Sequence, residues 1–331
     1  MSESSPLKIS IAMATYNGAA YLQEQLDSFL AQTRLPDEVV ITDDCSTDET
    51  LEIIKGFEES APFNVHWEQN EHNLGYTGNF NKALIKTTGD LVFLSDQDDV
   101  WFRDKLEQVE RYAAEHPAAL VLMNDAALTD GELNDTGLTK LGQITSAGLS
   151  HSSFVMGCCA AVRRDLLELC LPIPDDYRGH DGWIVKMAEG MGRKRVFTDV
   201  LQWYRRHETN ESQFIANRIE RVSRTAALKH KIQKHVKTAE HHDQAQQTVL
   251  QMQRFLEGVR AAQAKAESPF ADELLQFAQQ LTGRLQTMES RMAIRRRPRL
   301  QRLPGVIHLW KSGGYHDFSG AKSALRDIVF R

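Results

Sequence analysis

Short apolar runs alternate with helix-type patterns along the first hundred residues. The apolar runs, which read as strands, lie at 8–14, 38–42, 65–68 and 91–94. Between them, apolar positions recur every three or four residues over 21–32 and 78–86, which indicates helices. Strands that alternate with helices in this way predict a mostly parallel α/β sheet.

Polar residues stand directly after three of these strands. Thr15 follows the first strand, Asp43 and Asp44 follow the second, and the acidic group at 96–99 follows the fourth. In open α/β sheets, ligands bind beyond the carboxyl ends of the strands. We therefore expect these polar residues to converge on one rim of the sheet.

Other local signals predict further helices and strands in the first two thirds of the chain. Ser46 or Thr47, with Glu49 behind it, resembles a capping box that opens a helix. Residues 154–162 read as a strand and 163–171 as a helix.

After residue 214 strand signals become rare and helical spacing dominates. A heptad-like seam runs through Leu274, Ala278, Leu281, Leu285, Met288 and Met292, before a basic run at 295–299 and a tail with Trp310 and Phe330. The sequence thus predicts an α/β domain over 1–214 and a helical region over 215–331.

Composition narrows the class of protein. The 331 residues carry a formal charge of −6, which argues against nucleic acid as a partner. The four cysteines lack metal-ligand spacing and fit a reducing compartment. No run of 18 apolar residues occurs, so we expect a cytoplasmic protein that is at most peripheral to the inner face of the membrane.

The acidic group is the strongest chemical signal. Asp96, Asp98 and Asp99 place three carboxylates within four positions, which repel one another unless a cation lies among them. Mg²⁺ or Mn²⁺ bridging two phosphates would be such a cation. The alternative is an acidic turn with Asp99 as the N-cap of the next helix.

Taken together, three segments resemble a known family. Residues 9–17 (Ile-Ser-Ile-Ala-Met-Ala-Thr-Tyr-Asn), 43–48 (Asp-Asp-Cys-Ser-Thr-Asp) and 95–101 (Ser-Asp-Gln-Asp-Asp-Val-Trp) are similar to family 2 glycosyltransferases with the GT-A fold. The last segment looks most like bacterial rhamnosyltransferases of O-antigen and capsule synthesis. The resemblance covers about residues 7–210 and implies inverting transfer from a nucleotide-sugar with a divalent metal on the diphosphate.

The resemblance also implies roles for the residues of the nucleotide loops. Ala14, Thr15 and Tyr16 should flank the base. Asp44 should accept a hydrogen bond from the imide N–H of uracil or thymine, whereas Asp43 should orient the loop or the ribose. Gly75 and Asn79 match a looser pattern near the nucleotide, for which a turn and a helix start are an equal alternative.

The remaining roles concern metal, base and phosphate. Asp98 should ligate the metal directly, and Asp96 should contact metal or ribose. Asp181 occupies the family's place for the catalytic base, and an N-cap role for it is compatible with that. His207 should reach metal or diphosphate, and Arg205 or Arg206 should pair with phosphate.

Several readings stay open at this point. Trp101 and Trp183 could stack on a sugar or belong to the core. The donor is dTDP-L-rhamnose or a UDP-hexose such as galactose, glucose or GlcNAc, and the acceptor is a glycan, in one version lipid-linked. A different class is a non-catalytic helical scaffold with a degenerate transferase domain. The helical region could mediate homo-oligomerisation, docking or peripheral contact with the inner membrane through its basic run.

Overall fold

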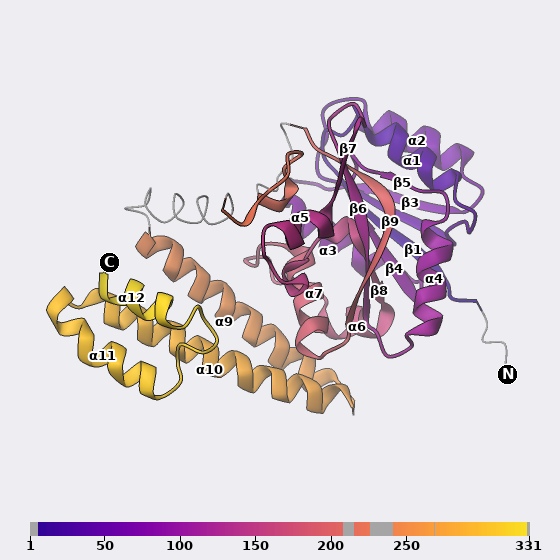
Figure 1. Ribbon diagram of the computed structural model, residues 1–331. Helices are drawn as coiled ribbons and strands as arrows, with labels where there is room; N and C mark the ends of the chain where they lie inside the picture. The colour runs from indigo at the N-terminus through magenta and orange to yellow at the C-terminus, as the bar shows by residue number, and fades with distance from the viewer. Residues whose placement is uncertain (1–5, 208–214, 226–240, 268, 330–331) are drawn as a thin grey trace. The chain divides into compact units, whose positions relative to one another are not determined.

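The computed structural model describes residues 6–207, 215–225, 241–267 and 269–329 (Figure 1). It divides into two compact units, Met1–His230 and Lys231–Arg331, and each is considered by itself. None of the described helices combines the length and the apolar character that crossing a bilayer requires.

The first unit is built on one mixed sheet. The strands are β1 (Ile9–Thr15), β2 (Glu38–Asp43), β3 (Asn64–Gln69), β4 (Leu91–Ser95), β5 (Val100–Trp101), β6 (Val121–Thr129), β7 (Asp135–Thr139), β8 (Ala160–Arg163) and β9 (Lys194–Arg205). The parallel half of the sheet has the order β3-β2-β1-β4, and β8 joins it to the other half antiparallel to both β4 and β6. Beyond β6 come β9, which is parallel to β6, and β5, while β7 pairs with β6 separately.

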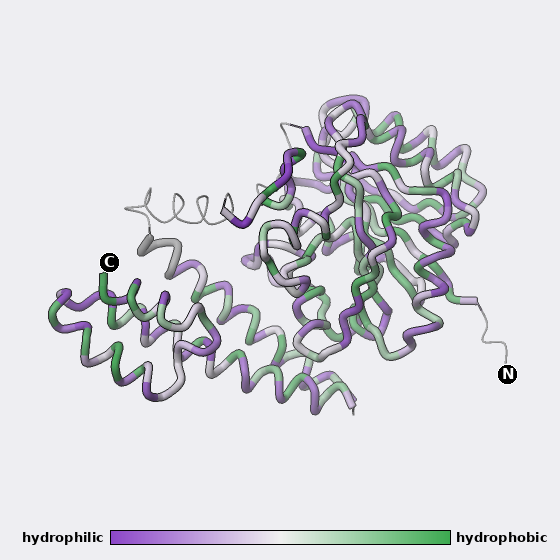
Figure 2. The backbone as a smooth tube through the Cα atoms, in the orientation of Figure 1, coloured by the Kyte–Doolittle hydropathy of each residue, from purple (hydrophilic) through white to green (hydrophobic). Residues whose placement is uncertain are grey.

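Helices cover this sheet and bury its apolar side chains. They are α1 (Leu22–Leu30), α2 (Thr50–Ser60), α3 (Gly75–Lys86), α4 (Lys105–Glu115), α5 (Lys140–Ser146), α6 (Arg164–Cys170) and α7 (His180–Gly190). Alternate residues of β1 (Ile9, Ile11 and Met13) are fully buried in one cluster with Leu26 and Phe29 of α1. Figure 2 shows the hydrophobic positions gathered in these central strands.

Two local predictions were wrong. The helix α2 begins at Thr50 without a side-chain cap, because the Ser46 hydroxyl instead donates to Asp43 and accepts from the Asn17 N–H. The strand expected over 154–162 is confined to β8, since the residues before it form a 3₁₀ turn, Gly157–Cys159.

Asp181 is also not the N-cap of its helix. That position belongs to Gly179, whose φ of 96° suits glycine, and Asp181 lies in the first turn of α7. A carboxylate there still benefits from the positive end of the helix dipole. Asp99 caps no helix either, because β5 follows it and α4 begins only at Lys105.

The second unit is helical where it is described. It contains α9 (His241–Lys265), α10 (Phe270–Arg296), α11 (Arg299–Lys311) and α12 (Ala321–Val329). The heptad-like seam lies on α10, which packs along α9, and its first half is buried at Leu274, Ala278 and Leu281. The predicted tail is thus two further helices, and Phe330 lies outside the described residues.

A buried carboxylate ties these last helices together. Asp327 of α12 is fully buried and accepts hydrogen bonds from Arg291 and Arg295 of α10 and from the Tyr315 hydroxyl. Arg295 is therefore paired inside the unit, whereas Arg296, Arg297 and Arg299 of the same basic run are exposed.

Candidate functional site

The loop after β2 is ordered by Asp43, which lies at the end of that strand. The Asp43 carboxylate is fully buried and accepts hydrogen bonds from Thr15 Oγ1 (3.0 Å), the Ser46 N–H (2.8 Å) and Gln69 Nε2 (3.2 Å). With the Ser46 hydroxyl as a further donor, both oxygens are occupied by protein groups. This geometry supports a role in orienting the loop; a contact to ribose stays a prediction.

Asp44 lies one residue farther along the chain and is also buried. Its Oδ1 accepts from Asn70 Nδ2 (2.9 Å) and from the Leu74 N–H (2.7 Å). Asn70 Nδ2 also donates to Asn79 Oδ1 (3.0 Å), and Asn79 Nδ2 in turn donates to the Thr15 carbonyl (3.1 Å). These hydrogen bonds therefore link Asp44 through Asn70 to Asn79, and Asn79 to the end of β1. Gly75 is the first residue of α3.

The acidic loop is fastened to the loop after β1 by Gln97. The Tyr16 N–H donates to Gln97 Oε1 (2.8 Å), and Gln97 Nε2 donates back to the Tyr16 carbonyl (3.0 Å). A Cβ on Gly18 would lie 2.3 Å from Gln97 Oε1, so only glycine leaves space for this pairing. Ala14, Thr15 and Tyr16 are thus held beside the acidic loop, and the Tyr16 side chain stays exposed.

Asp98 and His207 are brought together although 109 residues separate them in the chain. His207 Nε2 lies 2.7 Å from Asp98 Oδ2, and the His207 ring packs on Tyr21 with 4.7 Å between centroids. The end of β9 carries His207 to this place because β5 pairs with β9 next to the acidic loop.

Arg205 supports the same loop from below. Its Nε donates to the Asp98 carbonyl (2.9 Å), Nη1 donates to the Gly131 carbonyl (2.8 Å), and Nη2 pairs with Glu24. The side chain is buried and all three nitrogens have protein acceptors. In this arrangement Arg205 holds the acidic loop, and its pairing with phosphate stays a prediction.

Asp96 is the electrostatic centre of the group. Burial, together with the charges of Asp98 and Asp181, raises the pKa of Asp96 to about 7. The charges of Asp98 and of Asp181, which lies in the first turn of α7, therefore both act on the Asp96 carboxyl.

Beneath this surface lies a buried polar layer that sequence reasoning missed. Lys105 is buried with its Nζ 3.9 Å from the Trp101 ring centroid, and it donates to the Cys158 carbonyl (2.8 Å) and Gln202 Oε1 (2.5 Å). Gln202 Nε2 donates to Asp99 Oδ2 (2.9 Å). Burial and the neighbouring carboxylates raise the pKa of Asp99 well above its usual range. Burial lowers the pKa of Lys105 to about 8, which leaves it the internal cation of this layer at neutral pH.

The start of α7 is packed closely against the 3₁₀ turn. A Cβ on Gly157 would lie 2.8 Å from His180 Nε2 and 3.5 Å from the Asp181 Cβ. The His180 ring stacks on Phe80 of α3 with 3.9 Å between centroids, and neither ring nitrogen has a hydrogen-bond partner among the described residues. Gly157 and Phe80 therefore set the position of the turn that carries Asp181.

The donor atoms at this rim suit a hard divalent cation. Ligand atoms of Asp96, Asp99 and Cys158 lie within 4.8 Å of one another, and Asp98 with His207 adds a carboxylate and an imidazole. Burial, ahead of the charges of Asp98 and Asp181, raises the pKa of Asp96, so a bound cation would favour the ionised form of this carboxyl. Carboxylate oxygens are ligands that Mn²⁺ and Mg²⁺ favour, and Asp98, Asp96 and His207 are less buried than Asp99 and Cys158.

Neither predicted sugar-stacking tryptophan is exposed. The Trp101 ring packs on Phe29 with 4.8 Å between centroids, and Trp183 donates from Nε1 to the Cys170 carbonyl. Both side chains are buried, so the core reading holds for each.

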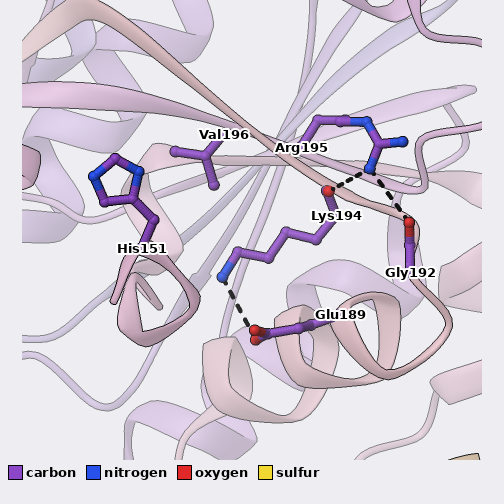
Figure 3. Close-up of a pocket in the computed structure, with 6 residues that line it drawn as sticks. All are labelled: His151, Glu189, Gly192, Lys194, Arg195 and Val196. Carbon is purple, nitrogen blue, oxygen red and sulfur yellow. Dashed lines mark hydrogen bonds and ion pairs between the residues drawn. The ribbon is translucent and has the colours of Figure 1, made fainter. Parts of the chain in front are cut away.

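A separate surface pocket of about 300 Å³ lies at the far end of β9 (Figure 3). Lys194 Nζ lies 3.6 Å from Glu189 there and donates to the Phe154 carbonyl (2.7 Å). Lys194 and Arg205 are the first and last of the 12 residues of β9, a span of roughly 35 Å at ~3.3 Å per residue. The pocket is therefore remote from the acidic group.

The family model described as "Glycosyl transferase family 2" matches residues 10–170. An uncharacterized glycosyltransferase of Nostoc sp., alr2836, is 30% identical over 214 residues, which are 62% of this chain and 66% of that protein. The dTDP-rhamnosyl transferase RfbG of Shigella flexneri is 37% identical over 99 residues, 29% of this chain and 34% of RfbG. The chain thus spans about a third to two thirds of the length of these curated relatives.

Solved structures agree on the architecture. The crystal structure of Staphylococcus aureus TarS 1–349 in complex with UDP-GlcNAc superposes with a TM-score of 0.52 at 19% identity, covering 82% of this chain and 89% of that one. Together with the family match, this confirms the expected GT-A fold.

Proposed function

We propose that this chain, which carries a family 2 glycosyl transferase domain over residues 10–170, moves a sugar from a nucleoside diphosphate donor to a hydroxyl of a glycan. The observation that carries the proposal is a group of carboxylates at one rim of the sheet: His207 Nε2 lies 2.7 Å from Asp98 Oδ2, and burial together with the charges of Asp98 and Asp181 raises the pKa of Asp96. One carboxylate pair would face the diphosphate, and the third would face the acceptor.

The nucleotide would lie between the loops after β1 and β2. Asp44, held by Asn70 and the Leu74 N–H, would accept the imide N–H of uracil or thymine. Tyr16 would flank the base from the loop that Gln97 fixes. Because both bases present the same imide edge, this contact selects the nucleotide class and not the sugar.

The diphosphate would lie against the acidic loop. Asp98 and Asp96, with His207, would hold Mn²⁺ or Mg²⁺, which when bound stabilises as a Lewis acid the negative charge that the leaving diphosphate gains. Arg205 would keep the Asp98 backbone in place through its hydrogen bond to that carbonyl.

Asp181 would act as the general base for an inverting transfer. The acceptor oxygen would attack the anomeric carbon from the face opposite the diphosphate and give its proton to an Asp181 oxygen. The bond from the anomeric carbon to the diphosphate oxygen would break, and its electron pair would leave with the nucleoside diphosphate. Asp181 Oδ1 accepts from the Gly182 N–H (2.6 Å), which fixes the orientation of the carboxylate at the start of α7.

The first donor candidate is dTDP-L-rhamnose, supported by the resemblance to RfbG. The second is a UDP-hexose, supported by the likeness to TarS, whose crystals contain UDP-GlcNAc. The acceptor class that fits both is a bacterial surface polysaccharide or its lipid-linked precursor. A degenerate scaffold is disfavoured because Asp44, Asp98 and Asp181 are all present.

A donor panel tests the proposal directly. The full chain is incubated with Mn²⁺ and each of dTDP-rhamnose, UDP-galactose, UDP-glucose, UDP-GlcNAc and GDP-mannose, and release of nucleoside diphosphate is measured with and without glycan acceptors. We expect turnover with a dTDP or UDP donor only. Preference for GDP-mannose would contradict the role of Asp44, and no turnover of any donor with any acceptor would favour the scaffold reading.

A further inference from the structure

The helix α11 carries apolar side chains on two of its faces. Its inner face, Val306 and Leu309, belongs to a buried cluster with Ile294, Tyr315 and Ala324. A second row of apolar side chains is exposed: Leu300 (95%), Leu303 (50%), Ile307 (46%) and Trp310 (49%). The spacing of 3, 4 and 3 puts these four on one side of the helix. We call them the α11 stripe.

The α11 stripe is presented by a firmly held element. Arg302, on the inner side of α11, is buried and donates to the carbonyls of Arg297 (2.8 Å) and Ile328 (3.1 Å). The clamp on Asp327 fixes α12 to α10. The stripe is therefore a fixed surface feature of the second unit and not the loose end of a chain.

Cations frame the stripe. Arg296, Arg297 and Arg299 are exposed at one end of it, and Lys311 is exposed at the other. Over residues 296–329 the acidic residues are Asp317 and Asp327, and Asp327 is already paired with two arginines. An apolar row with basic ends is the pattern by which helices lie in the interface of an anionic bilayer.

We propose that the α11 stripe docks on an anionic lipid surface, with Leu303, Ile307 and Trp310 at the level of the headgroups and acyl boundary. This is an interaction surface additional to the proposed sugar transfer, and its test does not depend on that activity.

A second copy of the chain fits the stripe less well. Two copies of one stripe would bring the same basic ends near each other, and like charges disfavour that contact. The exposed apolar area of four side chains is on the order of 500 Å², whereas a stable interface buries about 800 Å² per partner. Charge and area both favour a lipid surface over a dimer.

Vesicle flotation of the full chain tests the proposal. The probes are vesicles of phosphatidylcholine alone and of phosphatidylcholine with about 30% phosphatidylglycerol, each at low and high salt. We expect flotation with the anionic vesicles at low salt, loss at high salt, and little binding to the neutral vesicles. Absence of flotation by the intact chain under all conditions would overturn the proposal.

Matched variants assign the binding to the stripe. The double variant Leu303→Glu/Ile307→Glu should bind anionic vesicles at least tenfold more weakly than the wild type. The control Leu250→Glu/Leu275→Glu adds the same charge at equally exposed leucines of α9 and α10 and should bind within about twofold of the wild type. If both variants lost vesicle binding to the same extent, the change in net charge alone would explain the loss. The assignment of lipid binding to the α11 stripe would then be overturned. Circular dichroism checks that both remain folded.

Two further measurements distinguish a lipid surface from a second copy of the chain as the partner of the α11 stripe. The Trp310 contribution to fluorescence, taken as the difference from Trp310→Phe, should shift to the blue on vesicle binding; an unshifted difference spectrum would contradict insertion. Sedimentation should give the same mass for the wild type and for Leu303→Glu/Ile307→Glu. A dimer that this variant converts to a monomer, with vesicle binding unchanged, would assign the stripe to a second copy.

Discussion

Gln97 and Tyr16 form a two-way hydrogen-bonded pair, in which the carboxamide of Gln97 takes the place of a neighbouring strand for the Tyr16 backbone. The pair joins the two loops between which nucleotide and diphosphate would lie. Each hydrogen bond contributes about 1 kcal/mol, so the pair fixes the relative position of the loops without making either rigid by itself.

We expect Gln97→Ala to raise the KM for the nucleotide-sugar about tenfold while kcat changes by less than about threefold. The reason is that loop position is lost and the reacting groups are kept. Gly18→Ala should have a similar effect, because its Cβ would displace the Gln97 carboxamide. The double variant should then be no worse than Gly18→Ala; additive losses in steady-state kinetics would contradict the shared mechanism. Gln23→Ala, on the exposed side of α1, serves as the control.

Metal dependence follows from the Asp98 and His207 pair. Transfer should stop in EDTA and return with Mn²⁺ or Mg²⁺, and Asp98→Ala should lower turnover by orders of magnitude with weaker Mn²⁺ binding measured by electron paramagnetic resonance. Asp104→Ala, just before α4, should leave both quantities unchanged. Full activity in EDTA would show that the acidic loop serves another purpose.

The pH dependence of metal binding should centre on Asp96. Because its pKa is raised to about 7, Asp96 is protonated at pH 6 and ionised at pH 8. A cation competes with that proton, so apparent Mn²⁺ affinity should fall with decreasing pH below about 7, approaching tenfold per unit, and level off above it. Titration calorimetry from pH 5.5 to 8.5 measures this. A flat profile, or an unaltered one in Asp96→Asn, would place the titrating group elsewhere.

Asp181→Asn should abolish transfer and keep donor affinity. The amide retains the shape but cannot take the acceptor proton, and general bases contribute roughly 10²–10⁴-fold. Stopped or slow transfer combined with unchanged binding of the nucleoside diphosphate is the expected signature. Asp175→Asn, on the exposed segment before α7, is the matched control. A near wild-type rate for Asp181→Asn would mean that the base is a different group.

Lys105 should matter for folding as much as for the site. In Lys105→Met the Cys158 carbonyl and Gln202 Oε1 lose their buried donor, and a buried acceptor left unpaired costs about 1–3 kcal/mol. Urea unfolding measures the loss, with the exposed Lys186→Met as control. A loss below about 1 kcal/mol in Lys105→Met would contradict a stabilising role for these buried hydrogen bonds.

The strands and their polar ends could be predicted because they depend on local pattern. Apolar runs at 8–14 and 91–94 have one stable outcome in an α/β sheet, and Asp44 and Asp96 directly follow strands of this kind. Errors arose where tertiary contacts decided the outcome. Ser46 reads as a helix cap, yet its hydroxyl is used by Asp43, and nothing within the segment itself signals this.

The buried layer under the acidic loop could not be predicted for a similar reason. Lys105 reads as an ordinary solvated residue at a helix start, and its burial depends on Gln202 and on the carbonyl of Cys158, which come from distant parts of the chain. Gln97, by contrast, lies within the acidic motif. Its side chain carries both a hydrogen-bond donor and an acceptor and lies between two aspartates. That position could have indicated a role in holding the acidic loop in place.

The clamp on Asp327 also bears on how the protein would fare in a cell. A single change of Asp327 to alanine would leave the guanidinium groups of Arg291 and Arg295 and the Tyr315 hydroxyl without their shared acceptor. Such a substitution would loosen α11 and α12 and uncover the apolar cluster behind them. Proteases and chaperones would then determine the abundance of the variant, even with every residue of the sugar-transfer site intact.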